Sequence, residues 1–141
     1  MAETQTYLLD THAWFWLVRG REGQLAEKTV TKLERAALRA PLGVSVISIW
    51  EIALLASKGR IGLGMPTQDW VAAALNRPGF TQVDLDTATV IESCNLPGEF
   101  HADPADRFLV ATARLTNSIL VTRDTRILEY GELGHVKVTA A

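Results

Sequence analysis

Short apolar runs alternate with amphipathic stretches along most of this chain. The runs have the length of strands and lie at residues 7–9, 42–46, 80–83, 119–122 and 136–138. Between them, apolar residues recur at three- and four-residue steps, as in the surface helix expected from Leu25 to Leu38. This alternation predicts an α/β fold, a three-layer sandwich with a mainly parallel central sheet and helices on both faces.

Polar residues and prolines mark the expected starts of the helices. Ser48 is expected to cap the helix that follows the second apolar run. Proline is favoured at the first helical position, so Asp103-Pro104 predicts a further helix that runs to about Thr116. The segment 96–102 before it has the composition of a loop.

Length and composition predict a single domain over residues 1–141, because 141 residues with 48% hydrophobic and 21% charged residues are typical of one globular core.

Cys94 is the only cysteine, which excludes an internal disulfide and favours a reducing, cytoplasmic location. It is expected to be a small buried apolar residue. The polar start Met1–Gln5 lacks the layout of a secretory signal, and no apolar run approaches the roughly 20 residues that span a bilayer. Membrane insertion is therefore not expected.

The overall charge limits which partners the chain can bind through its global field. The net charge is -2 and the isoelectric point is near 5.9. A polyanion such as nucleic acid would have to be held by a local basic patch or through bound cations. Charge alone therefore disfavours a nucleic-acid partner.

Four acids stand at or just past the point where an apolar run ends, namely Asp10, Glu51, Asp106 and Asp124. The carboxyl ends of parallel strands share one edge of a sheet, where open α/β folds bind their ligands, so distant acids can become neighbours there. Each aspartate also has a simpler explanation, because Asp is favoured at helix N-caps and in the first helical turn. Asp103 fits the cap explanation better than a ligand role.

Glu51 is harder to explain as a structural residue. On a helix it shares one stripe with Ile47, Leu54 and Leu55, and this stripe should face the core. A buried carboxylate without a partner is costly, so it needs a cation, hydrogen bonds or a proton. The alternatives are an ion pair with Lys58 or an arginine, a position at a half-solvated rim, and a metal-binding or catalytic role.

Taken together, the four acids predict a divalent metal. Carboxylates gathered at one place repel each other and raise some of their pKa values unless a cation neutralises them. Oxygen ligands without paired cysteines or histidines favour Mg2+, or Mn2+, over zinc. Mg2+ held by carboxylates takes water and phosphate oxygens as its further ligands. Where two such ions are bound, they lie about 4 Å apart. Hydrolysis of phosphodiesters is therefore the expected reaction.

The segments around these acids resemble those of PIN-domain ribonucleases, and most closely the VapC-like toxins of type II toxin-antitoxin modules. The likeness extends over nearly the whole chain. The segments that carry it occur in the order Leu8-Leu9-Asp10-Thr11-His12, Ser48-Ile49-Trp50-Glu51-Ile52, Asp103-Pro104-Ala105-Asp106-Arg107 and Leu120-Val121-Thr122-Arg123-Asp124. One departure is Ala105, where family members often carry a bulky apolar residue.

The resemblance implies roles for individual residues. Asp10 and Asp106 would be the principal Mg2+ ligands, with Glu51 and Asp124 completing the cluster directly or through water. Thr11 and Thr122 are similar to positions that orient the carboxylates by hydrogen bonds. Their alternative role is ordinary packing at a turn or a strand end.

The resemblance also implies an activity and partners. The activity would be endonucleolytic cleavage of RNA by metal-activated water, without the 2'-hydroxyl as nucleophile. The partners would be an RNA substrate, a small antitoxin protein whose tail lies over the active site, and a second copy of the chain in a homodimer. The alternative is a non-catalytic interaction module of the same fold whose acids are helix caps. A phosphatase with an aspartyl intermediate is disfavoured, because His12 stands where such enzymes need a second aspartate.

Arginines and aromatic residues add further hypotheses. Arg107, Arg123 and Arg126 flank the proposed pocket in the sequence and are candidates for contacts with RNA phosphates. An ion pair with Asp103 explains Arg107 equally well. The aromatic stretch 14–16 is expected to lie in the core or at a subunit contact rather than to stack on bases.

Overall fold

The computed structural model describes residues 4–20 and 23–141. Within these ranges, five strands form one sheet in which every pairing is parallel. The spatial order is β3-β2-β1-β4-β5. The strands are β1 (Tyr7–Leu9), β2 (Leu42–Ser45), β3 (Phe80–Val83), β4 (Ile119–Thr122) and β5 (Val138–Ala140).

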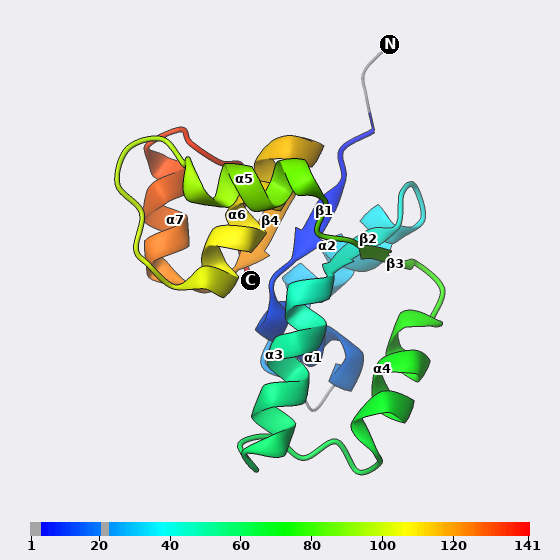
Figure 1. Ribbon diagram of the computed structural model, residues 1–141. Helices are drawn as coiled ribbons and strands as arrows, with labels where there is room; N and C mark the ends of the chain where they lie inside the picture. Colours follow the sequence, from blue (N-terminus) through cyan, green and yellow to red (C-terminus); the bar gives the residue numbers. More distant parts are fainter. Residues whose placement is uncertain (1–3, 21–22) are drawn as a thin grey trace.

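Helices cover both faces of the sheet (Figure 1). Helices α1, α2 and α4 contribute to a buried cluster on one face, and α5, α6 and α7 are grouped on the other. The helices of the described residues are α1 (Thr11–Arg19), α2 (Glu27–Ala37), α3 (Val46–Ser57), α4 (Thr67–Leu75), α5 (Thr87–Cys94), α6 (Pro104–Thr116) and α7 (Thr125–Glu132). The predicted three-layer α/β sandwich with a parallel central sheet is confirmed.

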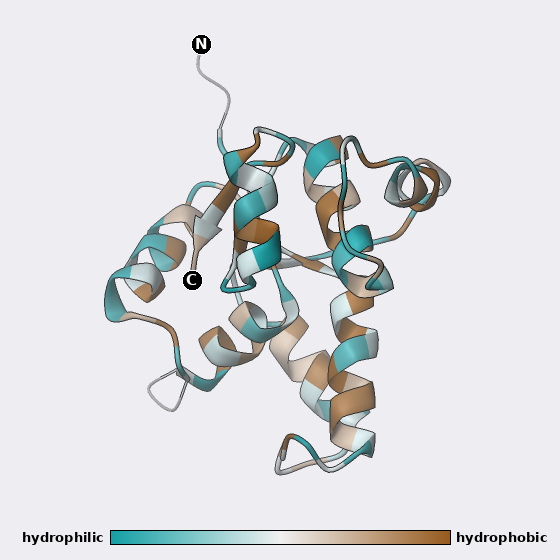
Figure 2. Cartoon of the chain, turned by 90° about the vertical axis from the view of Figure 1, so that its left-hand side faces the viewer, coloured by the Kyte–Doolittle hydropathy of each residue, from teal (hydrophilic) through white to brown (hydrophobic). Residues whose placement is uncertain are grey.

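The central strands separate two hydrophobic clusters because successive side chains of a strand point to opposite faces. Leu8 and Leu120 belong to the cluster beneath α6 and α7, whereas Leu9 and Val121 belong to the cluster beneath α1 and α2. All four side chains are almost completely buried. Figure 2 shows both teal and brown along the surface helices, which fits helices with one face toward such a core.

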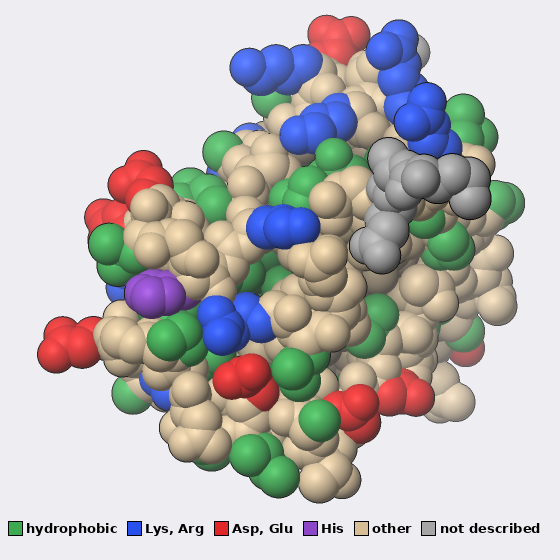
Figure 3. Space-filling model, turned by 90° about the horizontal axis from the view of Figure 1, so that it is seen from above, with side chains coloured by type: hydrophobic (Ala, Val, Ile, Leu, Met, Phe, Trp, Pro, Cys, Tyr) green, Lys and Arg blue, Asp and Glu red, His purple; other side chains and the backbone are tan. Residues whose placement is uncertain are grey.

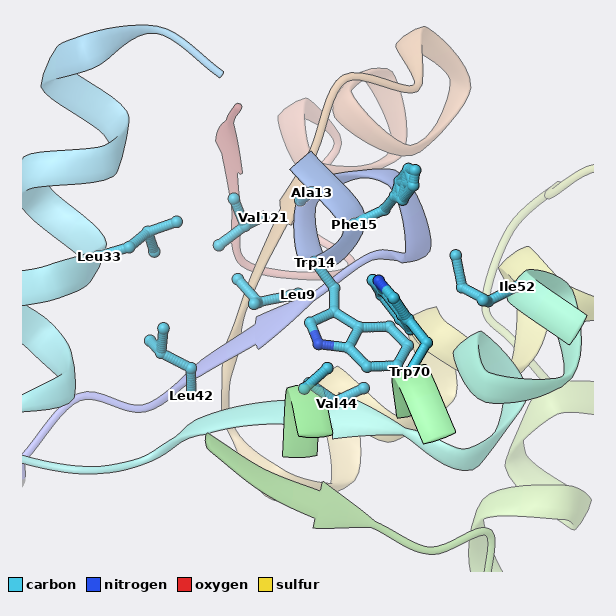
Figure 4. Close-up of a cluster of buried hydrophobic side chains, with 11 residues drawn as sticks. Leu9, Ala13, Trp14, Phe15, Leu33, Leu42, Val44, Ile52, Trp70 and Val121 are labelled. Carbon is cyan, nitrogen blue, oxygen red and sulfur yellow. The ribbon is translucent and has the colours of Figure 1, made fainter. Parts of the chain in front are cut away.

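An aromatic group fills the cluster beneath α1 (Figure 4). Trp14 is fully buried and meets Trp70 of α4 edge to face, with the ring centroids 5.3 Å apart. The ring centroid of Phe15 lies 5.8 Å from that of Trp70. The expected core position is therefore confirmed for Trp14 and Phe15, while Trp16 is only partly buried.

Three local predictions were wrong. Helix α3 begins directly after β2, so Ser45 is its N-cap and accepts a hydrogen bond from the backbone N–H of Ile47 at 3.1 Å, whereas Ser48 is buried inside the helix. The last strand begins at Val138 rather than at residue 136, because Val136 packs into the core before the chain pairs with β4. Cys94 is exposed, since it ends α5 on the solvent side.

The expectation that the chain does not insert into a membrane can be compared with the structure only for the described residues. Residues 1–3 of the polar start lie outside the described residues. No helix within residues 4–20 and 23–141 combines the length and the apolar character that crossing a membrane requires.

The sheet order creates one place where a ligand crevice is expected. From β1 the chain moves to β2 and β3 on one side, and then returns to β4 and β5 on the other. The strand order therefore reverses between β1 and β4, and open α/β sheets bind ligands beyond the carboxyl ends of the strands at such a point. Asp10 lies there, with its backbone N–H bonded to the carbonyl of Val121 at 3.0 Å.

Candidate active site

A pocket of about 280 Å³ opens beyond the carboxyl ends of β1 and β4. It brings together all four acids singled out from the sequence, although these come from separate elements of the chain. The residues that line it are Asp10, Thr11, His12, Trp16, Glu51, Asp103, Asp106, Leu109, Arg123, Asp124 and Arg126.

Asp10 joins β1 to α1 and uses both of its carboxylate oxygens. Oδ1 accepts a hydrogen bond from the backbone N–H of Ala13 at 2.9 Å, which makes Asp10 the N-cap of α1. Oδ2 accepts a hydrogen bond from the buried hydroxyl of Thr122 at 2.6 Å. The same hydroxyl oxygen accepts the backbone N–H of Asp124 at 3.0 Å, so Thr122 links the ends of the two central strands.

Glu51 is partly buried on α3 and is held by a hydroxyl rather than by a cation. Thr11 donates to its Oε1 at 2.5 Å, and the Thr11 hydroxyl also lies 2.9 Å from that of Ser48. Lys58, considered as an ion-pair partner, is exposed at the C-cap of α3. Glu51 forms no ion pair with any residue in the described ranges.

Asp106 and Asp124 complete the cluster from the other face of the sheet. Asp106 lies in the first turn of α6. Asp124 caps α7, and its Oδ1 accepts the backbone N–H groups of Arg126 and Ile127 at 2.9 and 3.1 Å. One ligand atom each of Asp106, Asp124 and His101 lies within 4.8 Å of the others, a separation that a single ion can bridge.

Burial and mutual repulsion make ionisation of the pocket costly. Burial is the largest cause that raises the pKa of Asp106 to about 7, followed by the charges of Asp103, Asp124, Glu51 and Asp10. Burial also raises the pKa values of Asp10 and Glu51, although their hydrogen bonds from Thr122 and Thr11 act in the opposite direction. A divalent cation would relieve both the desolvation and the repulsion.

Asp103 is the N-cap of α6, as predicted, and accepts the backbone N–H of Ala105 at 3.0 Å. It is exposed at the rim of the pocket. Its charge is still the strongest of the like charges acting on Asp106 and on Glu51. Asp103 therefore shapes the electrostatics of the pocket even though its structural role is that of a cap.

His101 is the pocket neighbour that the sequence did not reveal. Its Nε2 lies 3.1 Å from Oδ2 of Asp106, and its Nδ1 accepts the backbone N–H of Asp103 at 3.3 Å. Burial is the main cause that lowers the pKa of His101, which favours the neutral imidazole. A histidine five residues before an acid, in a segment without periodicity, gives no pattern from which this contact could be predicted.

The three candidate arginines have different positions. Arg107 does not line the pocket; it donates to the backbone carbonyls of Ser93, Phe100 and His101 at 2.8, 3.0 and 3.1 Å. It forms no ion pair with Asp103 in the described part of the chain either.

The other two arginines do line the pocket. Arg123 lies over the ring of Trp16 with 4.8 Å to its centroid, and it donates to the carbonyls of Ala141 and Gln24. Arg126 is exposed too, and its guanidinium lies 3.9 Å from the carboxylate of Asp124. Arg123 is tied to two backbone carbonyls, so Arg126 is the freer of these two to contact a ligand.

Comparison with known proteins decides the family. The sequence pattern of the PIN domain matches residues 7–133. The chain belongs to the PIN domain family. The resemblance read from the sequence segments is thereby confirmed, and the match spans every acid of the pocket.

Individual relatives of this PIN domain agree with that assignment. It is 34% identical to Ribonuclease VapC22 of Mycobacterium tuberculosis, over 86% of this chain and 89% of the relative. The solved structure of VapBC2 from Rickettsia felis bound to a DNA fragment from its promoter has a similar fold, with a TM-score of 0.70, 16% identity, and coverage of 97% of this chain and 99% of that one. FitAcB from Neisseria gonorrhoeae gives a TM-score of 0.65 at 21% identity, over 94% and 96%.

Proposed function

We propose that this PIN domain is a metal-dependent endoribonuclease that acts as the toxin of a toxin-antitoxin pair. The observation that carries the proposal is the convergence of Asp10, Glu51, Asp106 and Asp124 on one pocket, where burial and repulsion raise the pKa of Asp106 to about 7. The name of the relative in M. tuberculosis supports ribonuclease activity. A cytoplasmic location belongs to the same proposal.

The donor set fits Mg2+ or Mn2+. Asp10 and Asp106 would be the principal ligands, and Glu51 and Asp124 would complete the site directly or through water. Carboxylate oxygens are the ligands that hard divalent cations prefer. When bound, the cation supplies a water of lowered pKa and neutralises charge on the phosphate.

The chain's own residues would fix this arrangement before a substrate arrives. Thr122 and Thr11 donate to Asp10 and Glu51, so both carboxylates keep one orientation. Arg126 at the rim can contact an RNA phosphate, because its guanidinium is exposed beside the acids. The partly buried ring of Trp16 closes one side of the pocket.

The direct test is cleavage of RNA by the purified protein. We expect cleavage with Mg2+, none in excess EDTA, and continued cleavage when the 2'-hydroxyl at the cleaved position is replaced by hydrogen. Cleavage that persists in EDTA, or that requires the 2'-hydroxyl, would rule out metal-activated water as the nucleophile.

A non-catalytic interaction module is the alternative function, and the helix caps favour it in part. Asp10 and Asp124 both cap helices, so their positions need no chemistry to explain them. Glu51 and Asp106 cap no helix, and both carry raised pKa values in the same pocket. Retaining such a repulsive pair is costly to a module that only binds partners, and for this reason the nuclease is preferred.

The partners are also part of the proposal. We expect a small antitoxin that covers the acid pocket and a homodimer of this chain, as the family resemblance implies. Size-exclusion chromatography with light scattering tests the dimer. Co-purification of a small protein whose removal releases nuclease activity tests the antitoxin.

The position of Thr122 leads to a first prediction. Thr122→Val removes the donor to Asp10 and the acceptor for the Asp124 N–H, so Mg2+ affinity should fall by roughly 10- to 100-fold. Thr122→Ser keeps the hydroxyl and should bind Mg2+ nearly as the wild type does. Isothermal titration calorimetry measures both, and equal affinities for Val and Ser would show that the hydroxyl does not orient the ligands.

We infer that a basic stripe along α2 and the turn after it is the local patch with which an acidic protein can hold RNA. Lys28, Lys32, Arg35 and Arg39 follow one another at steps of four, three and four residues and are all exposed, with Glu27 beside the first of them. Figure 3 shows Lys and Arg side chains gathered along the upper margin of that view. The N-terminal end of α2 lies near the pocket, since Arg123 donates to the carbonyl of Gln24.

A second prediction follows for this stripe. Lys28→Gln combined with Arg35→Gln should weaken RNA binding and reduce the slope of log affinity against log salt by about 1.4, because neutralising each phosphate of a single strand contributes about 0.7 to that slope. Filter binding or fluorescence anisotropy across a salt series measures the slope. Lys58→Gln combined with Arg60→Gln makes the same charge change at the end of α3 and should leave the slope unchanged.

A further inference from the structure

We propose that His101 is a positioning residue, which donates its Nε2–H to Asp106 and fixes that carboxylate toward the cation, and that Arg107 holds His101 in place. The inference rests on the proposed metal-dependent function. It assigns a role to two residues outside the four-acid cluster, one of which was expected to contact RNA.

The hydrogen bonds of the imidazole determine which nitrogen carries the proton. Nδ1 accepts the backbone N–H of Asp103 at 3.3 Å, so it must present a lone pair. A neutral imidazole has one N–H, which then lies on Nε2. That nitrogen is buried and forms no hydrogen bond of good geometry with any described residue, and the nearest carboxylate oxygen, Oδ2 of Asp106, lies 3.1 Å away. The carboxylate is therefore the acceptor available to its N–H.

The ring itself is held from several directions. Its centroid lies 4.3 Å from that of Phe100, and the backbone carbonyl of His101 accepts a hydrogen bond from Arg107. Arg107 also binds the carbonyls of Phe100 and Ser93, so it ties the loop to α5. Asp106 and Arg107 are consecutive on α6. One turn of the helix therefore carries both the carboxylate and the arginine that holds His101 beside it.

A direct metal-ligand role for His101 is the competing interpretation. Its Nε2, together with Asp106 and Asp124, satisfies the distances for one ion. Ligation through Nε2 would require a lone pair on that nitrogen and would move the proton to Nδ1, where it would face the N–H of Asp103. Donation to Asp106 keeps both contacts, and it leaves an all-oxygen site for a hard cation.

Substitutions that place the amide donor differently distinguish these roles. In His101→Gln the side-chain amide reaches the position of Nε2, whereas in His101→Asn it reaches only that of Nδ1. We expect His101→Gln to keep Mg2+ affinity within about threefold and His101→Asn to lose about 10- to 100-fold, by calorimetry without RNA. Equal losses in the two variants would overturn the proposal.

Nitrogen-15 NMR of the metal-free protein gives a readout independent of activity. The His101 resonances should report the Nε2–H tautomer in the wild type, and an Nδ1–H tautomer would overturn the proposal. If the wild type binds no Mg2+ at all, both this inference and the proposed function fail. If it binds Mg2+ and cleaves RNA while Gln and Asn behave alike, only the inference fails.

Arg107 can be tested against a matched residue on the same helix. Arg107→Lys removes part of the clamp and should reduce Mg2+ affinity several-fold. Arg114→Lys weakens a similar clamp, the contact of Arg114 with the carbonyl of His135, near the end of α6 that lies away from the pocket. It should lower the unfolding temperature while Mg2+ affinity stays at the wild-type value. Equal Mg2+ affinities in the two variants would contradict the role of Arg107.

Discussion

Asp106→Asn should abolish RNA cleavage and at the same time raise the unfolding temperature of the metal-free protein at about pH 8. The loss of activity should be at least about 100-fold, because residues that merely orient metal ligands already contribute roughly 10- to 100-fold. The gain in stability has a separate cause. Burial and four neighbouring acids raise the pKa of Asp106 to about 7, so ionising it in the folded state is unfavourable, and Asn removes that cost. Each kcal/mol gained should raise the midpoint by about 3 °C in a chain of this size.

Asp103→Asn is the matched control for this prediction. It removes one negative charge from the rim of the same pocket while keeping a residue that caps helices well. Activity should therefore stay close to that of the wild type. A large loss of activity in Asp103→Asn, or a destabilised Asp106→Asn, would contradict the assignment of Asp106 as a ligand and Asp103 as a cap.

Much of this site could be predicted because topology brings the acids together. Asp10 and Asp124 follow the parallel strands β1 and β4, whose carboxyl ends lie side by side. Glu51 was recognisable because it shares a helical stripe with apolar residues. In each case the pattern of the local sequence determines where the side chain can be.

The errors arise where contacts between distant segments decide the outcome. Arg107 follows Asp106 directly, but consecutive residues on a helix point about 100° apart, so it binds loop carbonyls instead of facing the pocket. His101 lies beside Asp106 because the loop that carries it folds back onto α6, where Arg107 binds the carbonyls of Phe100 and His101. The Ser48 error is a local one: strand β2 passes into α3 without a loop, so the cap is Ser45.

The raised pKa values predict how stability should vary with pH and Mg2+. The pKa of Asp106 is about 7 in the folded protein and near the ordinary 3.8 in the unfolded chain, so the folded state retains the proton more strongly. This contribution to stability is complete below about pH 4 and is lost as the pH rises through about 7. Asp10 and Glu51 act in the same direction.

The metal-free protein should therefore be less stable at about pH 8 than at about pH 5, and Mg2+ should stabilise it more at the higher pH. Between these two pH values the upper bound for Asp106 is about 3 kcal/mol, because the contribution falls by about 1.4 kcal/mol per pH unit up to its folded pKa of about 7, and solvent at the pocket reduces it. Urea unfolding at both pH values, with and without Mg2+, measures the effect, and Asp106→Asn should flatten the pH dependence. A cation held by these carboxylates must displace the proton that Asp106 keeps at low pH. Equal stabilisation by Mg2+ at both pH values would therefore mean that the ion does not bind there.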